Sequence, residues 1–155
     1  MVAMSLGTTE WILAPVVVAL VACISVLAWA ETAIGRTSRA RAAAMVDQLG
    51  PRAERVLRLA SAPERYVNVM LLLLLMLQLT EATLVGVLGA RLFGPVGLVV
   101  ATILNVVVVF VVAEAAPKTW ALEHPESALL AAPLVEMLAG FPPLRWLSRS
   151  LIGMS

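Results

Sequence analysis

Long apolar segments alternate with polar ones along the chain, and this alternation predicts how the chain is organised. Apolar residues dominate residues 11–34, 66–90 and 97–116. A helix of about 20 apolar residues crosses the roughly 30 Å hydrocarbon core of a bilayer. The pattern therefore predicts three transmembrane helices over these ranges, with a tight turn between the second and the third at residues 91–97, where two glycines flank Pro95.

The polar connection over residues 36–65 is rich in arginine and alanine. It carries seven basic residues, Arg36, Arg39, Arg41, Arg52, Arg55, Arg58 and Arg65. By the positive-inside rule this connection is cytoplasmic, so the N-terminus is expected outside. We expect one or two short helices here near the lipid headgroups, with a basic face that is solvated or touches anionic lipid.

The last segment is apolar but interrupted by prolines. Residues 126–155 contain no uninterrupted run of about 18 apolar residues, so a fourth span is not expected. The pattern favours an amphipathic belt helix along the inner interface, with Arg145, Trp146 and Arg149 at the headgroups. This arrangement places the C-terminus in the cytoplasm.

Composition agrees with a membrane protein and excludes several other classes. Hydrophobic residues make up 61% of the chain and charged residues 14%, with a net charge of +1, and mean hydropathy is +0.97. The chain is therefore predicted to be an all-α integral membrane protein of the plasma membrane, with the lipid bilayer as a partner and without nucleic acid. Its one cysteine, Cys23, is expected to be a small packing residue. No Ser-His-Asp set, H-E-x-x-H motif or nucleotide loop is present, so an enzyme is not expected.

Polar side chains within the predicted spans are the candidates for chemistry. They all offer oxygen atoms, which are the ligands that Mg²⁺ prefers, and they are Ser25, Glu31, Gln78, Glu81, Asn105 and Glu114. One octahedral shell cannot contain all six, because Glu31 and Glu114 lie about 9 to 13 Å nearer the cytoplasm by helical rise. Our hypothesis is a cytoplasm-facing cavity in which Glu114 and a subset of Ser25, Asn105 and Gln78 bind the ion. In this hypothesis Glu31 holds helix ends together.

Structural roles for the same side chains are the alternatives. Glu81 can be a protonated acid that hydrogen-bonds a neighbouring helix, Asn105 can bridge helices, and Ser25 can bond back to its own helix. Asn105 and Glu114 are nine residues apart, about 180° around a regular helix. They can face one site only if the helix is irregular between them, or else each serves a different neighbour. Lys118 is expected to be a snorkelling anchor, and a gate is the alternative role for it.

Two motifs carry a resemblance to a known family. AETAIGRTSRARA (residues 30–42) closes the first span and VVAEAAPKTWALEHPESALLAAP (residues 111–133) closes the third. They resemble the transmembrane domain of the CNNM/CorC magnesium transporters, in which E-T-A followed by S-R-x-R ends helix one and G-E-x-x-P-K-T ends helix three. The chain departs from that pattern at Ala113, where the family has glycine, and at Ala28, near which the family has serines. Its second span has Gln78 and Glu81 instead of a glycine-asparagine pair.

The resemblance implies a fold and a function. It implies three membrane helices, a belt helix, a homodimer, and a divalent-cation site between the helices. The implied function is Mg²⁺ transport, in the direction of export, with Na⁺ as a candidate coupling ion. Nucleotide-binding CBS modules usually follow this domain in the family, and none lies in this chain, which ends at Ser155. The alternative is a membrane scaffold or regulatory subunit of a larger membrane complex that keeps the fold without transporting ions.

Overall fold

The computed structural model describes residues 8–140, and every element in that range is a helix. The elements are α1 (Thr8–Gly35), α2 (Arg39–Leu49), the 3-10 helix η1 (Gly50–Ala53), α3 (Glu54–Ser61), α4 (Pro63–Val108), the π-helix η2 (Val109–Ala115), α5 (Ala116–Glu123) and α6 (Ser127–Ala139). The predicted all-α membrane fold is confirmed. Two helical stretches, Trp11–Gly35 and Pro63–Glu123, are long and apolar enough to cross a membrane, judged by length and composition.

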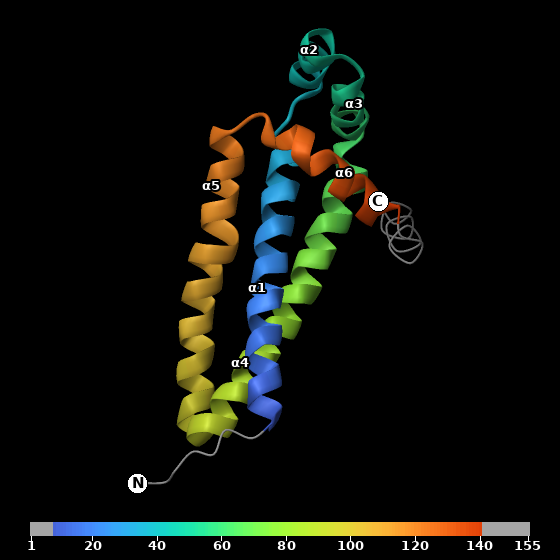
Figure 1. The fold of residues 1–155 in the computed structure, drawn as a ribbon. Helices are drawn as coiled ribbons and strands as arrows, with labels where there is room; N and C mark the ends of the chain where they lie inside the picture. The colour runs from blue at the N-terminus through green and yellow to red at the C-terminus, as the bar shows by residue number, and fades with distance from the viewer. Residues whose placement is uncertain (1–7, 141–155) are drawn as a thin grey trace.

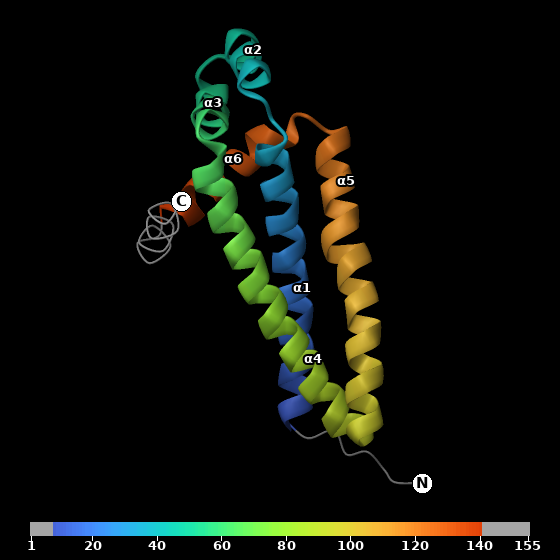
Figure 2. The ribbon, with the colours of Figure 1, turned by 180° about the vertical axis from the view of Figure 1, so that it is seen from behind.

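The second stretch is a helical hairpin that reverses at Gly94. Gly94 has φ 69° and ψ −157°, a conformation that is accessible to glycine because it has no Cβ. Figures 1 and 2 show the two arms of the hairpin running in opposite directions beside α1. The arms touch near the turn, where a Cβ built on Gly89 would lie 2.6 Å from the carbonyl oxygen of Gly97. Within the described residues the chain thus forms three long helical arms, which are α1, the part of α4 before Gly94, and the rest of α4 with η2 and α5.

The short helices lie at the end of the bundle where α1 ends and α4 begins, which we call the basic end (Figure 1). The backbone N–H of Arg41 donates to the Ser38 hydroxyl and so caps the start of α2. Gly50 ends that helix with φ 66°. The predicted short helices between the first two spans are therefore α2 and α3, joined by η1.

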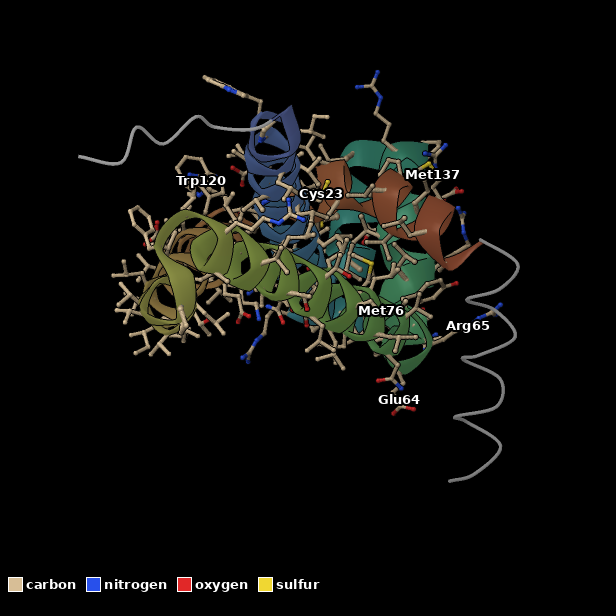
Figure 3. The ribbon with its side chains drawn as sticks, turned by 90° about the horizontal axis from the view of Figure 1, so that it is seen from below. Cys23, Glu64, Arg65, Met76, Trp120 and Met137 are labelled. Atoms are coloured by element: carbon tan, nitrogen blue, oxygen red, sulfur yellow. The ribbon has the colours of Figure 1, made fainter. Side chains whose placement is uncertain are left out.

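Helix α6 crosses the bundle at the basic end, close to α1 and α3 (Figure 1). Its inward face is built from small side chains and buries Ala128, Ala131 and Val135, while Met137 on its outward face is 66% exposed (Figure 3). The predicted belt helix therefore has its described part at Ser127–Ala139. Arg145, Trp146 and Arg149 lie outside the described residues.

The core is assembled from the facing sides of α1, α4 and α6. Ile24, Ala28 and Ile34 of α1 are buried together with Met70 and Leu74 of α4. Small residues among them let the helix backbones approach closely, as helix contacts in membranes require. The expectation that Cys23 packs inside is wrong. Cys23 lies on an exposed face of α1 (Figure 3), whereas the next residue, Ile24, is buried.

Candidate functional site

The third arm changes from α-helix to π-helix before it reaches Glu114. Val109–Ala115 form η2, and the N–H of Ala116 donates to the carbonyl of Val111, five residues back. A π segment inserts extra backbone into each turn and rotates the following side chains. The helix is therefore irregular between Asn105 and Glu114, as their half-turn offset required if both were to face inward.

Pro117 follows the π segment and leaves one of its carbonyls without a backbone partner. In the π pattern the carbonyl of Val112 would accept from residue 117, but proline has no N–H. In an α pattern it would accept from the N–H of Ala116, which donates to the carbonyl of Val111 instead. The Ser25 hydroxyl oxygen lies 3.5 Å from this carbonyl oxygen and 2.9 Å from the carbonyl oxygen of Val21 on its own helix. Ser25 thus lies between its own helix and an underused carbonyl.

The carboxylate of Glu114 is contacted from two sides. The amide of Gln78, on the other arm of the hairpin, donates to Glu114 Oε1. The Nζ of Lys118 lies 3.7 Å from Glu114 Oε2. The same Nζ lies 3.9 Å from Oε2 of Glu31 at the end of α1, and the Thr32 hydroxyl donates to that oxygen at 3.3 Å. One ammonium group therefore stands between two carboxylates that belong to different arms.

A cavity of about 280 Å³ lies beside this ammonium group at the basic end. Its lining is Glu31, Thr32, Gly35, Arg36, Val67, Lys118 and Leu122. Arg36 and Leu122 are exposed, whereas the Glu31 side chain retains 16% exposure and that of Lys118 35%. The cavity therefore connects the outer surface of the basic end to the Glu31–Lys118 contact.

Glu81 and Asn105 form a separate pair deeper in the hairpin. The amide of Asn105 donates to Glu81 Oε2 at 2.9 Å. Glu81 is 1% exposed, and its Oε1 has no hydrogen-bond partner among the described residues. Burial of a polar atom without a partner is costly. This pair joins the two arms of the hairpin, as the bridging alternative for Asn105 supposes.

The six candidate residues thus fall into groups. Gln78 meets Glu114, Asn105 meets Glu81, and Glu31 reaches the first pair through Lys118, while Ser25 lies by the π segment. Within residues 8–140, no three histidine, cysteine or acidic side chains are placed to hold one metal ion. Mg²⁺ keeps several waters and is commonly held by only one or two carboxylates, so a site with a single carboxylate suits its chemistry.

Two contributors to the site were missed by sequence reasoning. Lys118 lies four residues after Glu114, a spacing that places both on one side of a helix, so this contact could have been predicted. The Val112 carbonyl, which has the Ser25 hydroxyl oxygen at 3.5 Å, meets Pro117 instead of a backbone N–H because of the π segment. No residue pattern in the sequence predicts this segment. Carbonyl oxygens freed where a membrane helix unwinds are known cation ligands in transporters.

Comparison with known proteins places the chain in a family. The sequence model of the cyclin M transmembrane N-terminal domain matches residues 15–153. The chain is also 33% identical over 129 residues to the inner membrane protein YfjD of Escherichia coli (strain K12), an alignment that covers 80% of this chain and 29% of that relative. The chain thus spans less than a third of the relative's length. Because the family model covers most of the sequence, this membrane protein belongs to the cyclin M (CNNM) transmembrane-domain family.

Proposed function

We propose that this protein transports Mg²⁺ across the membrane, with Glu114 as the principal ion ligand. The observation that carries the proposal is the position of this carboxylate. It lies at a π segment between two arms, within reach of the Gln78 amide and of a lysine at a cavity of the basic end. Polar groups at this position in a bundle of apolar arms are expensive unless they serve an ion or each other.

The remaining ligands in this proposal are neutral oxygens. The Gln78 amide can turn by 180° about its last bond and present its oxygen in place of its nitrogen. The Ser25 hydroxyl and the Val112 carbonyl supply further oxygens on the facing helices. Glu31 then receives the ion from the cavity, and waters complete the octahedral shell. Glu81 and Asn105 hold the hairpin arms together below this site.

Export of Mg²⁺ with Na⁺ as the coupling ion is the direction that the family resemblance supports. This coupling is tested with proteoliposomes that contain Mg²⁺ and are placed in a solution that contains Na⁺. We expect Mg²⁺ release that depends on the imposed Na⁺ gradient. Equal Mg²⁺ release in both directions of the Na⁺ gradient would refute coupling to Na⁺ but would still be consistent with Mg²⁺ transport.

The experiment that tests transport compares two glutamate substitutions of identical chemistry. Glu114→Gln removes the proposed ligand charge and keeps the side-chain volume. Glu123→Gln removes an equal charge from an exposed position at the end of α5 and serves as the control. We expect Mg²⁺ flux in proteoliposomes, and the Mg²⁺-dependent rise in melting temperature of the purified protein, to be lost in the first variant and kept in the second. Unchanged flux in Glu114→Gln would exclude the proposed site.

A scaffold or regulatory subunit is the second candidate, and one observation favours it. The Lys118 ammonium lies 3.7 Å from Glu114 and 3.9 Å from Glu31, so one positive charge already offsets part of the charge of these two carboxylates without an ion. Under this candidate, millimolar Mg²⁺ leaves the melting temperature of the wild-type protein unchanged, and a larger membrane protein co-purifies with it. Stabilisation by Mg²⁺ that depends on Glu114 rejects it.

A further inference from the structure

A groove at the basic end combines arginines with apolar side chains outside the cation site. It has a volume of about 560 Å³ and lies between the η1–α3 region and α6. Its lining is Pro51, Arg52, Arg55, Leu129, Leu130 and Pro133. None of these residues takes part in the contacts around Glu114, so the groove requires an explanation of its own.

Positive charge exceeds negative charge along one edge of the groove. Glu136 of α6 is held by Arg58, whose Nη2 lies 2.9 Å from Oε1. The Nε of Arg55 lies 3.8 Å from Oε2 of the same carboxylate, longer than the 2.7–2.9 Å of a charge-assisted hydrogen bond. Arg52 adds a further exposed guanidinium. The lining of the groove therefore holds two arginines and no carboxylate, and Arg52 and Arg55 can still donate to another anion.

The opposite edge of the groove is apolar and continues along α6. Leu130 is 71% exposed, Pro133 is exposed three residues later, and Met137 follows one turn further on. These positions share one side of the helix. Helix α6 lies where the apolar arms of the bundle meet the polar helices α2 and α3 (Figure 1). A ligand here meets charge at one end and hydrocarbon at the other.

We propose that this groove binds an anionic phospholipid. The headgroup phosphate lies between Arg52 and Arg55, because planar guanidinium groups match the oxygens of a phosphate and accept its charge. One acyl chain lies along Leu130 and Pro133 and continues over Met137. Basic pockets beside membrane helices bind anionic headgroups by this chemistry. The bound lipid would fix α6 against α3 in addition to the Glu136 contacts, and the proposal is independent of Mg²⁺ transport.

The test measures lipid binding to the full-length protein in detergent. The probes are phosphatidylglycerol, phosphatidylcholine and inorganic phosphate, and the readout is the lipid-dependent rise in melting temperature, with bound lipid counted by native mass spectrometry. We expect phosphatidylglycerol to bind more tightly than the other two. Arg52→Gln should weaken the affinity for phosphatidylglycerol about fivefold, which is the contribution of one arginine at an anionic lipid surface. The Arg52→Gln/Arg55→Gln variant should weaken this affinity more strongly.

The matched control is Arg39→Gln/Arg41→Gln, which removes two exposed arginines from α2, outside the groove. It should keep phosphatidylglycerol affinity within about twofold. An equal loss in the control would show diffuse attraction to the basic end and overturn the site. If inorganic phosphate stabilised the protein as much as phosphatidylglycerol does, the occupant of the groove would be a soluble phosphate and the lipid proposal would be refuted. The single Arg52→Gln variant leaves the Glu136 contacts in place, so a loss of binding there does not arise from a loosened α6.

Discussion

Lys118 is the residue whose replacement most directly tests the charge arrangement at the candidate site. Its ammonium stands 3.7 Å from Glu114 and 3.9 Å from Glu31, in the place that a cation bound to either carboxylate would approach. Lys118→Met removes the charge and keeps an apolar stem of similar length. If Lys118 is a counter-cation that an arriving ion must displace, this substitution should raise the affinity for Mg²⁺. An anchoring role alone predicts no change.

The expected size follows from distance and charge. An ion bonded to Glu114 at about 2.1 Å lies within roughly 6 Å of Nζ if Lys118 does not move. Repulsion between one unit charge and two unit charges at about 6 Å is about 1.4 kcal/mol with the dielectric constant of water. Its removal should lower the Kd for Mg²⁺ about tenfold. Without Mg²⁺ the variant should lose about 1 kcal/mol of stability, because both ionic contacts are partly solvated.

Isothermal titration calorimetry of the purified protein with MgCl₂ measures this shift. Lys118→Arg keeps the charge and should bind Mg²⁺ as the wild type does. The difference between Lys118→Met and wild type should shrink as NaCl is raised, because salt screens partly exposed charges. An unchanged or higher Kd in Lys118→Met, with the variant folded, would refute the counter-cation role.

Two further predictions concern the hairpin. Asn105→Leu leaves buried Glu81 without its donor and should lower the free energy of unfolding by about 1–3 kcal/mol. The Glu81→Leu/Asn105→Leu double variant should lose less stability than that single variant. Unfolding in mixed micelles measures both losses, and additive losses would contradict the pairing. Gly97→Ala should destabilise by about 1–3 kcal/mol, because a Cβ there meets the Gly89 backbone. In Gly35→Ala the new Cβ meets Val67 Cγ2 at 3.5 Å and Glu31 Oε1 at 3.7 Å, which are ordinary van der Waals distances, so this control should keep wild-type stability in the same assay.

The arms of the bundle could be predicted from the sequence because the bilayer imposes a simple rule. In hydrocarbon every backbone polar group must be bonded within its own segment, so a long apolar run becomes a helix. The reversal was readable as well, since Gly94 precedes Pro95 and glycine tolerates the required positive φ. The family motifs at Glu114 and Pro117 located the polar end of the third arm.

The pairing of polar side chains could not be predicted, because it depends on how the helices are rotated against one another. The sequence offered Glu114 and Asn105 as ligands of one ion, whereas the structure gives each a different partner on the second arm. A rotation of one residue, about 100°, exchanges such partners. The position of the Lys118 ammonium also depends on rotamers of a long side chain, so spacing alone predicts its contact with Glu114 but not its contact with Glu31.

The register of the hairpin explains how the π segment bears on the proposed transport. At the turn, Gly89 lies five residues before Gly94 and its neighbour Gly97 lies three residues after it. Further along, Glu81 lies thirteen residues before Gly94 and its partner Asn105 eleven residues after it. In both pairs the residue on the first arm of the hairpin is two residues further from Gly94 than its partner, so the offset between the arms is constant.

Between Gln78 and Glu114 this register changes. Gln78 lies sixteen residues before Gly94 and Glu114 twenty after, so the returning arm uses six more residues than the earlier register requires. The π segment lies within that stretch. Its wider turns rise less per residue, so Glu114 lies somewhat deeper than a regular α-helix would place it, and the Gln78 and Glu114 side chains meet across the remaining distance. In the transport that we propose, this displacement turns a carboxylate of the membrane boundary into an inner ligand, while Glu31 stays at the cavity mouth.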